Sequence, residues 1–505
     1  MSVSQTTEEP KIDELLPMAG LICIGIGLVL GLWLGYTGST LPVAAVAGIA
    51  FFFILLKQQV AALTFVIMAQ VMIPIYVGVP LVPGLPPLPP SLLMALVLAT
   101  ITFLWAMLDR RDKLQLSFLP KLLIAAYALS VSVVLFSVVI NGSGKESINV
   151  WGRSSMIPFM VFLTTVFIAR STSQIQNLFN VLLIAAMLAV FYAGIEFILG
   201  KNILIESFIE RQFDDRDIPY WTLVDGDSAG FIYRAHSVFT NPLFFGTFLS
   251  MIAPYPILRF VKGQGEKHRY FFIFAAIVCV LGVFLTFSRG PMLGLFLSLV
   301  ALSVFLKSLR KVLVMSILTC LLCLLFAWPW IGAKVADRFS DIDNVSIRFK
   351  LWESAVHMYL DNPVLGVGLG NFPQHQLEVN RNYRIGPFNE SDGDHIESVR
   401  TADSLYLQYM AEMGTAGVLA ALFKYWLLAL IFTRLLKNTQ NDQIWLLNLA
   451  TTAAVVAYLI NGLTITAYQG YSITIFKEMF FAFGIALYSI HILQRDEQSA
   501  PVTRQ

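Results

Sequence analysis

The feature that most constrains the fold is the series of long apolar stretches along this chain of 505 residues. Hydrophobic residues make up 57% of the sequence and charged residues only 13%, which lies far from the composition of soluble domains. Apolar windows bounded by turns and charges predict an all-α polytopic membrane protein with about fourteen transmembrane helices and two long extracytoplasmic loops. The spans lie near residues 17–36, 40–56, 60–79, 92–108, 119–140, 154–169, 177–198, 238–258, 271–287, 291–306, 312–330, 415–432, 445–465 and 473–493.

The basic residues are distributed unevenly over the connections between these spans. With the N-terminus in the cytoplasm, the short outer loops hold only Lys145, Arg153 and Arg289. The inner loops hold Lys57, Arg110, Arg111, Lys113, Lys121, Arg170, Arg259, Lys262, Lys267, Arg269, Lys307, Arg310, Lys311, Arg434 and Lys437. The positive-inside rule therefore predicts that both termini are cytoplasmic. The first 16 residues carry acids rather than the basic start of a signal peptide, so the first span is expected to remain as an anchor.

This topology divides the chain into tails, membrane regions and loops. We predict a cytoplasmic tail at 1–16, transmembrane helices at 17–198, an extracytoplasmic loop at 199–237, central transmembrane helices at 238–330, a long extracytoplasmic loop with an interfacial helix at 331–414, C-terminal transmembrane helices at 415–493 and a cytoplasmic tail at 494–505. The net charge of +2 and the acidic outer loops do not favour nucleic acid as a partner.

Arg289 is the single ionised residue between Phe271 and Leu306. The sequence Ser288-Arg289-Gly290-Pro291 predicts a tight external turn, in which Gly290 supplies backbone freedom and Pro291 starts the next helix. Arg289 would then lie at a helix N-terminus, where unpaired N–H groups and the helix dipole favour an anion. We expect it to bind a phosphate carried by a lipid substrate. The alternative is an arginine that snorkels to lipid phosphates.

Two further outer segments carry polar residues beside predicted helices. Arg234 and His236 precede a helix expected to start near Asn241-Pro242. Residues 346–363 predict an amphipathic helix in the interface plane, with Arg348 and Trp352 on one side. It leads into GVGLGNF at 366–372. This sequence lacks the strand and helix that a nucleotide loop requires, so we interpret it as a flexible lid or as a close backbone approach to substrate.

The segment 401–420 places polar residues before a membrane span. Asp403 and Ser404 resemble an N-terminal helix cap. The alternative is that Asp403, partly buried at the mouth of a cavity, acts as a base or orients a sugar hydroxyl, because burial raises the pKa of a carboxylate.

Taken in order, these motifs resemble the O-antigen ligase and O-antigen polymerase family. They are SRG between two spans, R-x-x-x-W at Arg348 and Trp352, P-x-x-G-x-G-x-x-x-F from Pro363 to Phe372, and D-S-x-Y-L-x-x-x-x-E-x-G from Asp403 to Gly414. The resemblance covers about residues 230–420, and the first 200 residues are similar only as a succession of membrane helices. It implies a GT-C-like architecture.

The resemblance also implies an integral-membrane glycosyltransferase whose donor is a glycan on undecaprenyl diphosphate. The acceptor is a sugar hydroxyl, and neither a metal nor another cofactor is expected. Arginines would stabilise the diphosphate leaving group. The predicted catalytic residues are Asp403 and Arg289, and the predicted substrate contacts are Arg234, His236, Arg289, Arg348, Trp352, Gly368, His395, Arg400 and Tyr406.

The chain departs from the ligases at two positions. Ligases typically carry His where this chain has Asp403, and Asn where it has Ser404, so His395 and His236 are alternative bases. We therefore favour a polymerase of O-antigen, capsule or exopolysaccharide over a ligase that transfers the glycan to lipid A-core or another acceptor. The expected location is the bacterial inner membrane with the active site on the periplasmic face. The expected partners are membrane lipids and a chain-length regulator or flippase.

Other classes of protein remain as alternatives. A transporter or flippase for lipid-linked glycans would use Lys424, which lies well inside a span. However, no repeated halves are visible, and the charge gathers at one membrane face. A cell-wall glycan polymerase of the shape, elongation and division type shares the carrier but not the order of motifs. The Asp-Gly-Asp stretches at 225–227 and 392–394 allow divalent-cation binding, although Asp-Gly is also ordinary turn chemistry.

Overall fold

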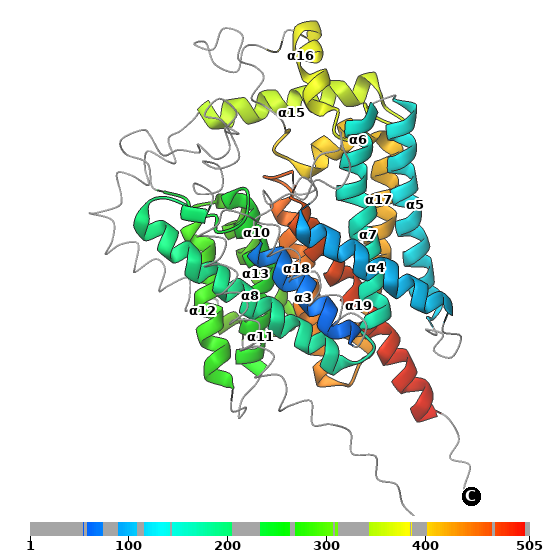
Figure 1. Cartoon of the computed structure of the whole chain (residues 1–505), viewed down its shortest axis with the longest axis vertical. Coiled ribbons are helices and arrows are strands. Elements are labelled where there is room, and N and C mark those ends of the chain that lie inside the picture. The colour runs from blue at the N-terminus through cyan, green and yellow to red at the C-terminus, as the bar shows by residue number, and fades with distance from the viewer. Residues whose placement is uncertain are drawn as a thin grey trace, which may run out of the picture. The chain divides into compact units, whose positions relative to one another are not determined.

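The computed structural model describes residues 54, 58–73, 89–108, 116–141, 144–204, 233–262, 268–306, 309–311, 343–383, 385, 401–466 and 470–499. The chain divides into two compact units, Met1–Gln58 and Gln59–Gln505, and every helix named below belongs to the second. Within the described residues the elements are helices and no strand forms (Figure 1). Their bounds are α3 (Gln59–Met72), α4 (Pro90–Leu108), α5 (Phe118–Ile140), α6 (Gly144–Trp151), the π-helical turn η1 (Gly152–Met156), α7 (Ile157–Ile168), α8 (Thr172–Leu199), α10 (Pro242–Ile252), α11 (Pro254–Lys262), α12 (Arg269–Leu285), α13 (Arg289–Phe305), α15 (Asp343–Asp361), α16 (Phe372–Tyr383), α17 (Leu405–Asn438), α18 (Asp442–Asn461) and α19 (Tyr471–Ser499).

Among the described residues, seven helical stretches are long and apolar enough to cross a membrane. They are Phe118–Ile140, Ser147–Ile168, Thr172–Leu199, Pro242–Lys262, Leu405–Asn438, Asp442–Asn461 and Tyr471–Asp496. Shorter apolar helices cover Gln59–Met72, Pro90–Leu104, Arg269–Leu285 and Arg289–Phe305. The expected spans at 17–36 and 312–330, and that at 40–56 apart from residue 54, lie outside the described residues, so the count of about fourteen stays a prediction.

Local sequence explains where several of these helices begin. The Ser171 side chain accepts from Gln174 N, and the Gln174 side chain returns to the Ser171 backbone, which is a capping box. Asn241 accepts from Leu243 N over 2.8 Å ahead of Pro242, which confirms the expected start of α10. The core lies around α19, whose apolar window is 94% buried. Each such helix satisfies its own backbone hydrogen bonds, as a bilayer requires.

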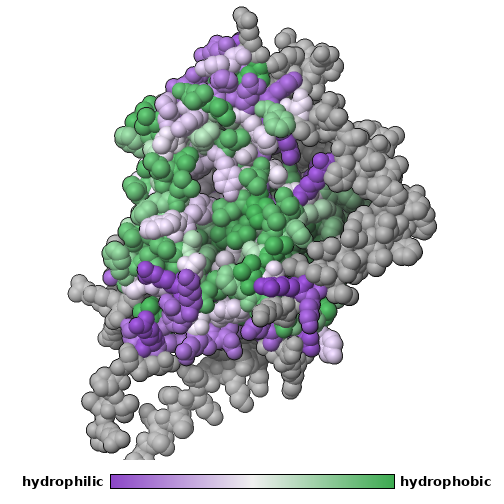
Figure 2. Space-filling view, turned by 180° about the vertical axis from the view of Figure 1, so that it is seen from behind, coloured by the Kyte–Doolittle hydropathy of each residue, from purple (hydrophilic) through white to green (hydrophobic). Residues whose placement is uncertain are grey.

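Hydrogen bonds bring many helix ends together at one end of the bundle, which we call the loop end (residues 141, 144, 200–202, 233–241, 285–290, 401–405, 461–466 and 470). Ala235 N donates to Leu285 O over 3.1 Å, and Leu405 N donates to Gly462 O over 2.8 Å. Basic residues mark a second region, which we call the basic end (Arg170, Arg259, Lys262, Arg269, Arg434 and Lys437). Lys262 Nζ lies 4.9 Å from the centre of the Trp445 ring there. Figure 2 shows a largely hydrophobic zone between hydrophilic residues above and below, as expected for a protein in a membrane.

Helix α15 forms over the stretch expected to be an amphipathic helix. It lies crosswise to the upright helices α5 and α17, with α16 above it (Figure 1). Leu351, Ala355 and Met358 are buried, whereas Phe349 and Leu360 are each 60% exposed. The helix therefore has one face against the protein and an apolar strip turned outward. Its position at a membrane interface stays a prediction.

Candidate functional site

Arg234 connects the segment before α10 to the turn that contains Arg289. Its Nε donates to Thr286 O over 3.2 Å, and its Nη2 donates to Ser288 Oγ over 2.8 Å. Helix α13 begins at Arg289, and the side chain of Arg289 is exposed. The structure thus confirms that Arg289 lies at a helix N-terminus.

Two details of this turn differ from the sequence interpretation. Pro291 is the third residue of α13 rather than the first. The residue with a left-handed backbone is Phe287, with φ 45°, rather than Gly290. A Cβ on Gly290 would lie 2.1 Å from Thr464 Oγ1. Glycine is therefore required here by close packing against the turn after α18, and not by backbone freedom.

Glu196, near the end of α8, organises the segment that carries Arg234 and His236. Its side chain is 1% exposed. Oε1 accepts from Tyr233 OH over 2.6 Å and lies 2.9 Å from His236 Nδ1, and Oε2 accepts from Ser237 N over 2.8 Å. A buried carboxylate with several donors is a strong positioning group. Sequence analysis missed it, because its only signal was a single acid near the end of an apolar span.

His236 is held on both sides of its ring. Nδ1 faces Glu196, and Nε2 lies 3.4 Å from Asn202 Nδ2. Asn202 also donates to Ser237 O over 2.7 Å. This arrangement orients the imidazole firmly at the loop end, but both of its nitrogen atoms have neighbours within the protein.

Asp403 does not cap α17. The N-cap residue is Ser404, whose side chain makes no capping hydrogen bond. Asp403 has a left-handed φ of 48°, and its Oδ1 accepts from Thr401 Oγ1 over 2.9 Å. Its Oδ2 lies 3.6 Å from Arg348 Nε, and the two side chains are 38% and 37% exposed. The predicted N-cap position is therefore confirmed for Ser404, although its side chain makes no cap, and the cap interpretation was wrong for Asp403, whose carboxylate is directed toward the arginine of α15.

A buried polar network behind Asp403 ties this loop to its neighbours. Gln408 Oε1 accepts from Ala402 N over 3.0 Å and from Thr466 Oγ1 over 2.9 Å. Gln408 Nε2 donates to Glu412 Oε1 over 3.0 Å. Buried networks of this kind fix a single arrangement when their members are satisfied. The sequence showed Gln408 and Glu412 only as polar residues that follow the predicted cap.

The GVGLGNF segment packs on α17. Val367 N donates to Ala411 O over 3.0 Å, and Gly368 N donates to Glu412 O over 2.9 Å. Gly366 has φ 65°, and a Cβ there would lie 2.3 Å from the Glu412 carbonyl carbon. The segment is largely buried. Its glycines therefore allow a close backbone approach to α17, which leaves little basis for a flexible lid at residues 366–372.

The remaining predicted residues are placed as follows. Trp352 is half-buried, and its ring meets the Phe349 ring edge-on at 5.3 Å. Tyr406 donates its hydroxyl to Leu459 O over 2.6 Å. Beyond α15, the Tyr383 hydroxyl hydrogen-bonds to Asp361, which raises the pKa of Tyr383. His395 and Arg400 lie outside the described residues.

The acidic stretches that allowed a metal site, at 225–227 and 392–394, also lie outside the described residues. Within the part of the chain that the structure describes, no group of three or more His, Cys, Asp or Glu side chains could hold a metal ion.

The Arg234–Arg289 turn and the loop that carries Asp403 both contact the turn after α18. Gly290 packs against Thr464, and Leu405 N is bonded to Gly462 O. The Arg234–Arg289 turn and the Arg348–Asp403 pair therefore lie around the same turn at the loop end. Cationic groups beside a carboxylate can bind a phosphate-bearing molecule and accept a proton next to it.

Comparison with known proteins gives one family. Residues 274–422 match the sequence model of the family described as O-Antigen ligase. No curated protein matches the chain. The matched segment runs from α12 into α17 and includes Arg289, Arg348, the GVGLGNF segment and Asp403, whereas Glu196 and Arg234 precede it. The match confirms the resemblance that the sequence motifs indicated, and over residues 274–422 this chain is similar to the O-antigen ligase family.

Proposed function

We propose that this protein is a polymerase of a surface polysaccharide. It transfers a glycan from an undecaprenyl diphosphate carrier to a sugar hydroxyl of a second glycan at the loop end of the bundle. The observation that carries the proposal is the Arg348–Asp403 pair, in which a carboxylate that caps no helix faces an arginine at a partly exposed position. The loop end faces the extracytoplasmic side of the bacterial inner membrane.

In the proposed reaction the arginines and the carboxylate act on opposite sides of the bond that breaks. The acceptor hydroxyl oxygen attacks C1 of the donor sugar, and the C1–O bond to phosphate breaks with inversion. The bonding electrons leave with the lipid diphosphate, whose developing charge Arg289, Arg234 and Arg348 stabilise. Asp403 takes the proton of the acceptor hydroxyl.

A ligase is the second candidate, and the family description supports it directly. A ligase performs the same displacement but uses a different acceptor, such as lipid A-core. We favour the polymerase because Asp403 and Ser404 stand where ligases typically carry His and Asn. The glycans that accumulate in a gene deletion separate the two: single repeat units indicate a lost polymerase, and long unattached chains indicate a lost ligase.

Asp403→Asn tests the proposed base. The substitution keeps the size and the hydrogen-bond acceptor, but an amide cannot take the proton. We expect turnover of a purified lipid-linked repeat unit to fall by at least about 10²-fold, with donor affinity retained. His236→Ala is the companion variant. A loss of turnover in His236→Ala but not in Asp403→Asn would identify His236 as the base. Near-normal turnover in Asp403→Asn would refute the assignment.

Arg289→Ala tests the proposed diphosphate site. Loss of the guanidinium removes a bidentate phosphate donor, so product formation should disappear although the protein still inserts. Arg289→Lys should restore only part of the activity, because lysine keeps the charge but not the planar pair of donors. Arg434→Ala, at the exposed end of α17, is the matched control. Glycan of normal length in a well-expressed Arg289→Ala variant would contradict the proposal.

A further inference from the structure

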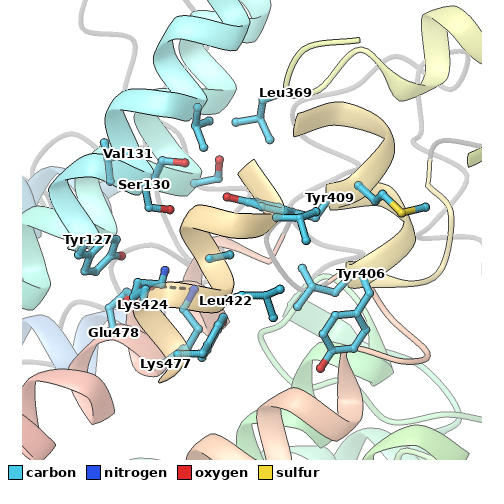
Figure 3. Close-up of a pocket in the computed structure, with 18 of the residues that line it drawn as sticks. Tyr127, Ser130, Val131, Leu369, Tyr406, Tyr409, Leu422, Lys424, Lys477 and Glu478 are labelled. Atoms are coloured by element: carbon cyan, nitrogen blue, oxygen red, sulfur yellow. Dashed lines mark ion pairs between the residues drawn. The ribbon is translucent and has the colours of Figure 1, made fainter. Parts of the chain in front are cut away.

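A cavity of about 290 Å³ lies between helices α5, α17, α18 and α19 and the turn η1. Figure 3 shows Lys424, Lys477 and Glu478 close together on one side of it, with Tyr127 next to them. Tyr406 lies on another side. The walls are mostly aromatic and aliphatic. Tyr406 and Leu422 line the cavity and are also 42% and 59% exposed, so the cavity opens beside α17.

The charges in this cavity do not balance. Lys477 Nζ and Glu478 Oε1 form an ion pair of 2.7 Å, with side chains 9% and 1% exposed. Lys424 is 6% exposed, and among the described residues it has neither a hydrogen bond nor an ion pair. Its Nζ instead lies 4.3 Å from the centre of the Tyr127 ring and 5.3 Å from that of Tyr425. Two ammonium groups and one carboxylate leave an excess positive charge.

An excess charge inside a membrane span is costly, and such residues commonly mark binding sites. Aromatic faces offset part of this cost for Lys424. An anion in the cavity would offset a larger part of the cost of burying this charge, because Coulomb attraction is strong where the surroundings are apolar. The cavity therefore favours a ligand that carries negative charge.

Glu478 adds a second requirement. Its Oε1 atom pairs with Lys477 and the Tyr127 hydroxyl faces the same carboxylate, but no donor lies in good hydrogen-bond geometry to its buried Oε2 atom. A buried acceptor without a well-placed donor is costly. A ligand with a hydroxyl group beside its anionic oxygen would satisfy both Glu478 and Lys424. A phosphate ester with a hydroxyl donor has this combination of groups.

The depth of the cavity indicates that the ligand is an amphiphile. Lys477 lies about two turns into α19, which corresponds to roughly 10 Å along the helix axis, and the walls around it are apolar. The volume is below the range of about 300–1,000 Å³ of drug-sized pockets, so the cavity accommodates a head group but not a whole lipid. The chains would stay outside, next to the exposed Leu422.

We propose that this cavity binds the phosphate head group of a membrane lipid, with Lys424 as its counter-ion and Glu478 as acceptor for a hydroxyl of the same head group. The source is either a phospholipid such as phosphatidylglycerol, whose glycerol supplies the hydroxyl, or a polyprenyl phosphate, whose protonated phosphate oxygen supplies it. The site is separate from the Arg289 turn and binds without glycan transfer. Its existence therefore does not depend on the proposed function.

Native mass spectrometry of the full-length protein tests this site. The protein is taken from nanodiscs of phosphatidylcholine that contain increasing fractions of phosphatidylglycerol or, in a second arm, undecaprenyl phosphate. We expect saturable retention of one phosphate lipid by the wild type. Lys424→Met should bind it at least about tenfold more weakly, because a charged hydrogen-bond partner is lost. Lys424→Arg should keep most of the affinity.

Three controls make the result decisive. Lys437→Met removes a lysine from the exposed end of the same helix and should leave retention unchanged. In the phosphatidylglycerol arm Arg289→Ala should also leave retention unchanged, which separates this site from the proposed diphosphate site. Lys424→Gln replaces Lys424→Met if the latter does not fold. The arm that saturates identifies the source of the head group. Equal retention by the wild type and the Lys424 variants, or saturation in neither arm, would overturn the proposal.

Discussion

Among the described residues, the ion pairs Arg348–Asp403 and Lys477–Glu478 have sharply different surroundings. Arg348 and Asp403 face each other over 3.6 Å at the loop end, and each side chain is more than a third exposed. Lys477 and Glu478 form a pair of 2.7 Å inside the helix bundle, and both are nearly fully buried. The first pair lies within the segment that matches the O-antigen ligase family, and the second lies outside it.

The difference in exposure indicates which pair can bind a substrate and which pair stabilises the fold. An exposed pair contributes about 0–1 kcal/mol to stability, so its partners can exchange each other for a substrate at little cost. A buried pair cannot open in this way, because removing one partner leaves an uncompensated charge in an apolar environment. We therefore expect the Arg348–Asp403 pair to serve the reaction and the Lys477–Glu478 pair to serve the fold.

Breaking the buried pair should have the largest effect. Glu478→Leu leaves Lys477 and Lys424 without a carboxylate, and we expect a loss of about 3–5 kcal/mol in the free energy of unfolding. The measurement is the yield of monodisperse protein in detergent, followed by its melting temperature. The double variant Lys477→Met/Glu478→Leu should recover part of the stability, because only Lys424 then lacks a carboxylate. A single variant as stable as the wild type would remove the contrast between the two pairs.

Breaking the exposed pair should affect turnover and not stability. Arg348→Ala should change the free energy of unfolding by less than about 1 kcal/mol. Glycan transfer should fall by about 10²-fold, as is typical when one group that stabilises developing charge is removed. Arg381→Ala, an exposed arginine on α16, is the control. If Arg348→Ala lowers stability and turnover together, the pair supports the fold as well.

Helix α17 is kinked at Gly414, between the two ion pairs. Asp403 precedes the kink, and Lys424, beside the Lys477–Glu478 pair, follows it. Gly414 has φ 60° and ψ −165°, a conformation that only glycine adopts readily. A Cβ there would lie 2.5 Å from the Val364 carbonyl carbon. Gly414→Ala should therefore cost about 1–3 kcal/mol by thermal unfolding. Gly194→Ala is a matched control, because a Cβ on that helical glycine meets nothing within 4 Å.

The smallest effect concerns the residue next to Asp403. Ser404→Ala removes a side chain that makes no capping hydrogen bond, so stability should change by less than about 0.5 kcal/mol. Asn241→Ala, which removes an observed cap on α10, should cost about 1 kcal/mol by the same measurement. Equal losses in the two variants would show that Ser404 supports α17 by another route.

The features that could be predicted from sequence are those with a local cause. Apolar length placed helices such as α5 and α8 within a few residues, because a membrane span must satisfy its own backbone. Asn241-Pro242 and the Arg289 turn marked helix starts through neighbouring residues alone. The motifs around Arg348 and Asp403 indicated the family, although no distance between them could be derived from their spacing.

The features that sequence reasoning missed depend on contacts between distant segments. Glu196 accepts hydrogen bonds from residues about forty positions away. Position 290 requires glycine because Thr464 leaves no room for a Cβ. Asp403 resembles a cap by its position before α17, yet its conformation and its contact with α15 direct it elsewhere. The pattern of residues along one helix cannot predict a contact with a distant segment, because capping preference and periodicity describe only the local chain.

The hydrogen bonds around Glu196 have a consequence for how the length of this chain can vary. Asn202, which follows α8, donates to Ser237 O, and Glu196 accepts from Ser237 N in the segment before α10. These contacts join Asn202 and Ser237 to each other, and none of the atoms in them belongs to residues 205–232. Lengthening a loop with fixed ends costs only about 0.6 kcal/mol per doubling. A change of chain length between Asn202 and Tyr233 should therefore leave Arg234 in its place beside Ser288.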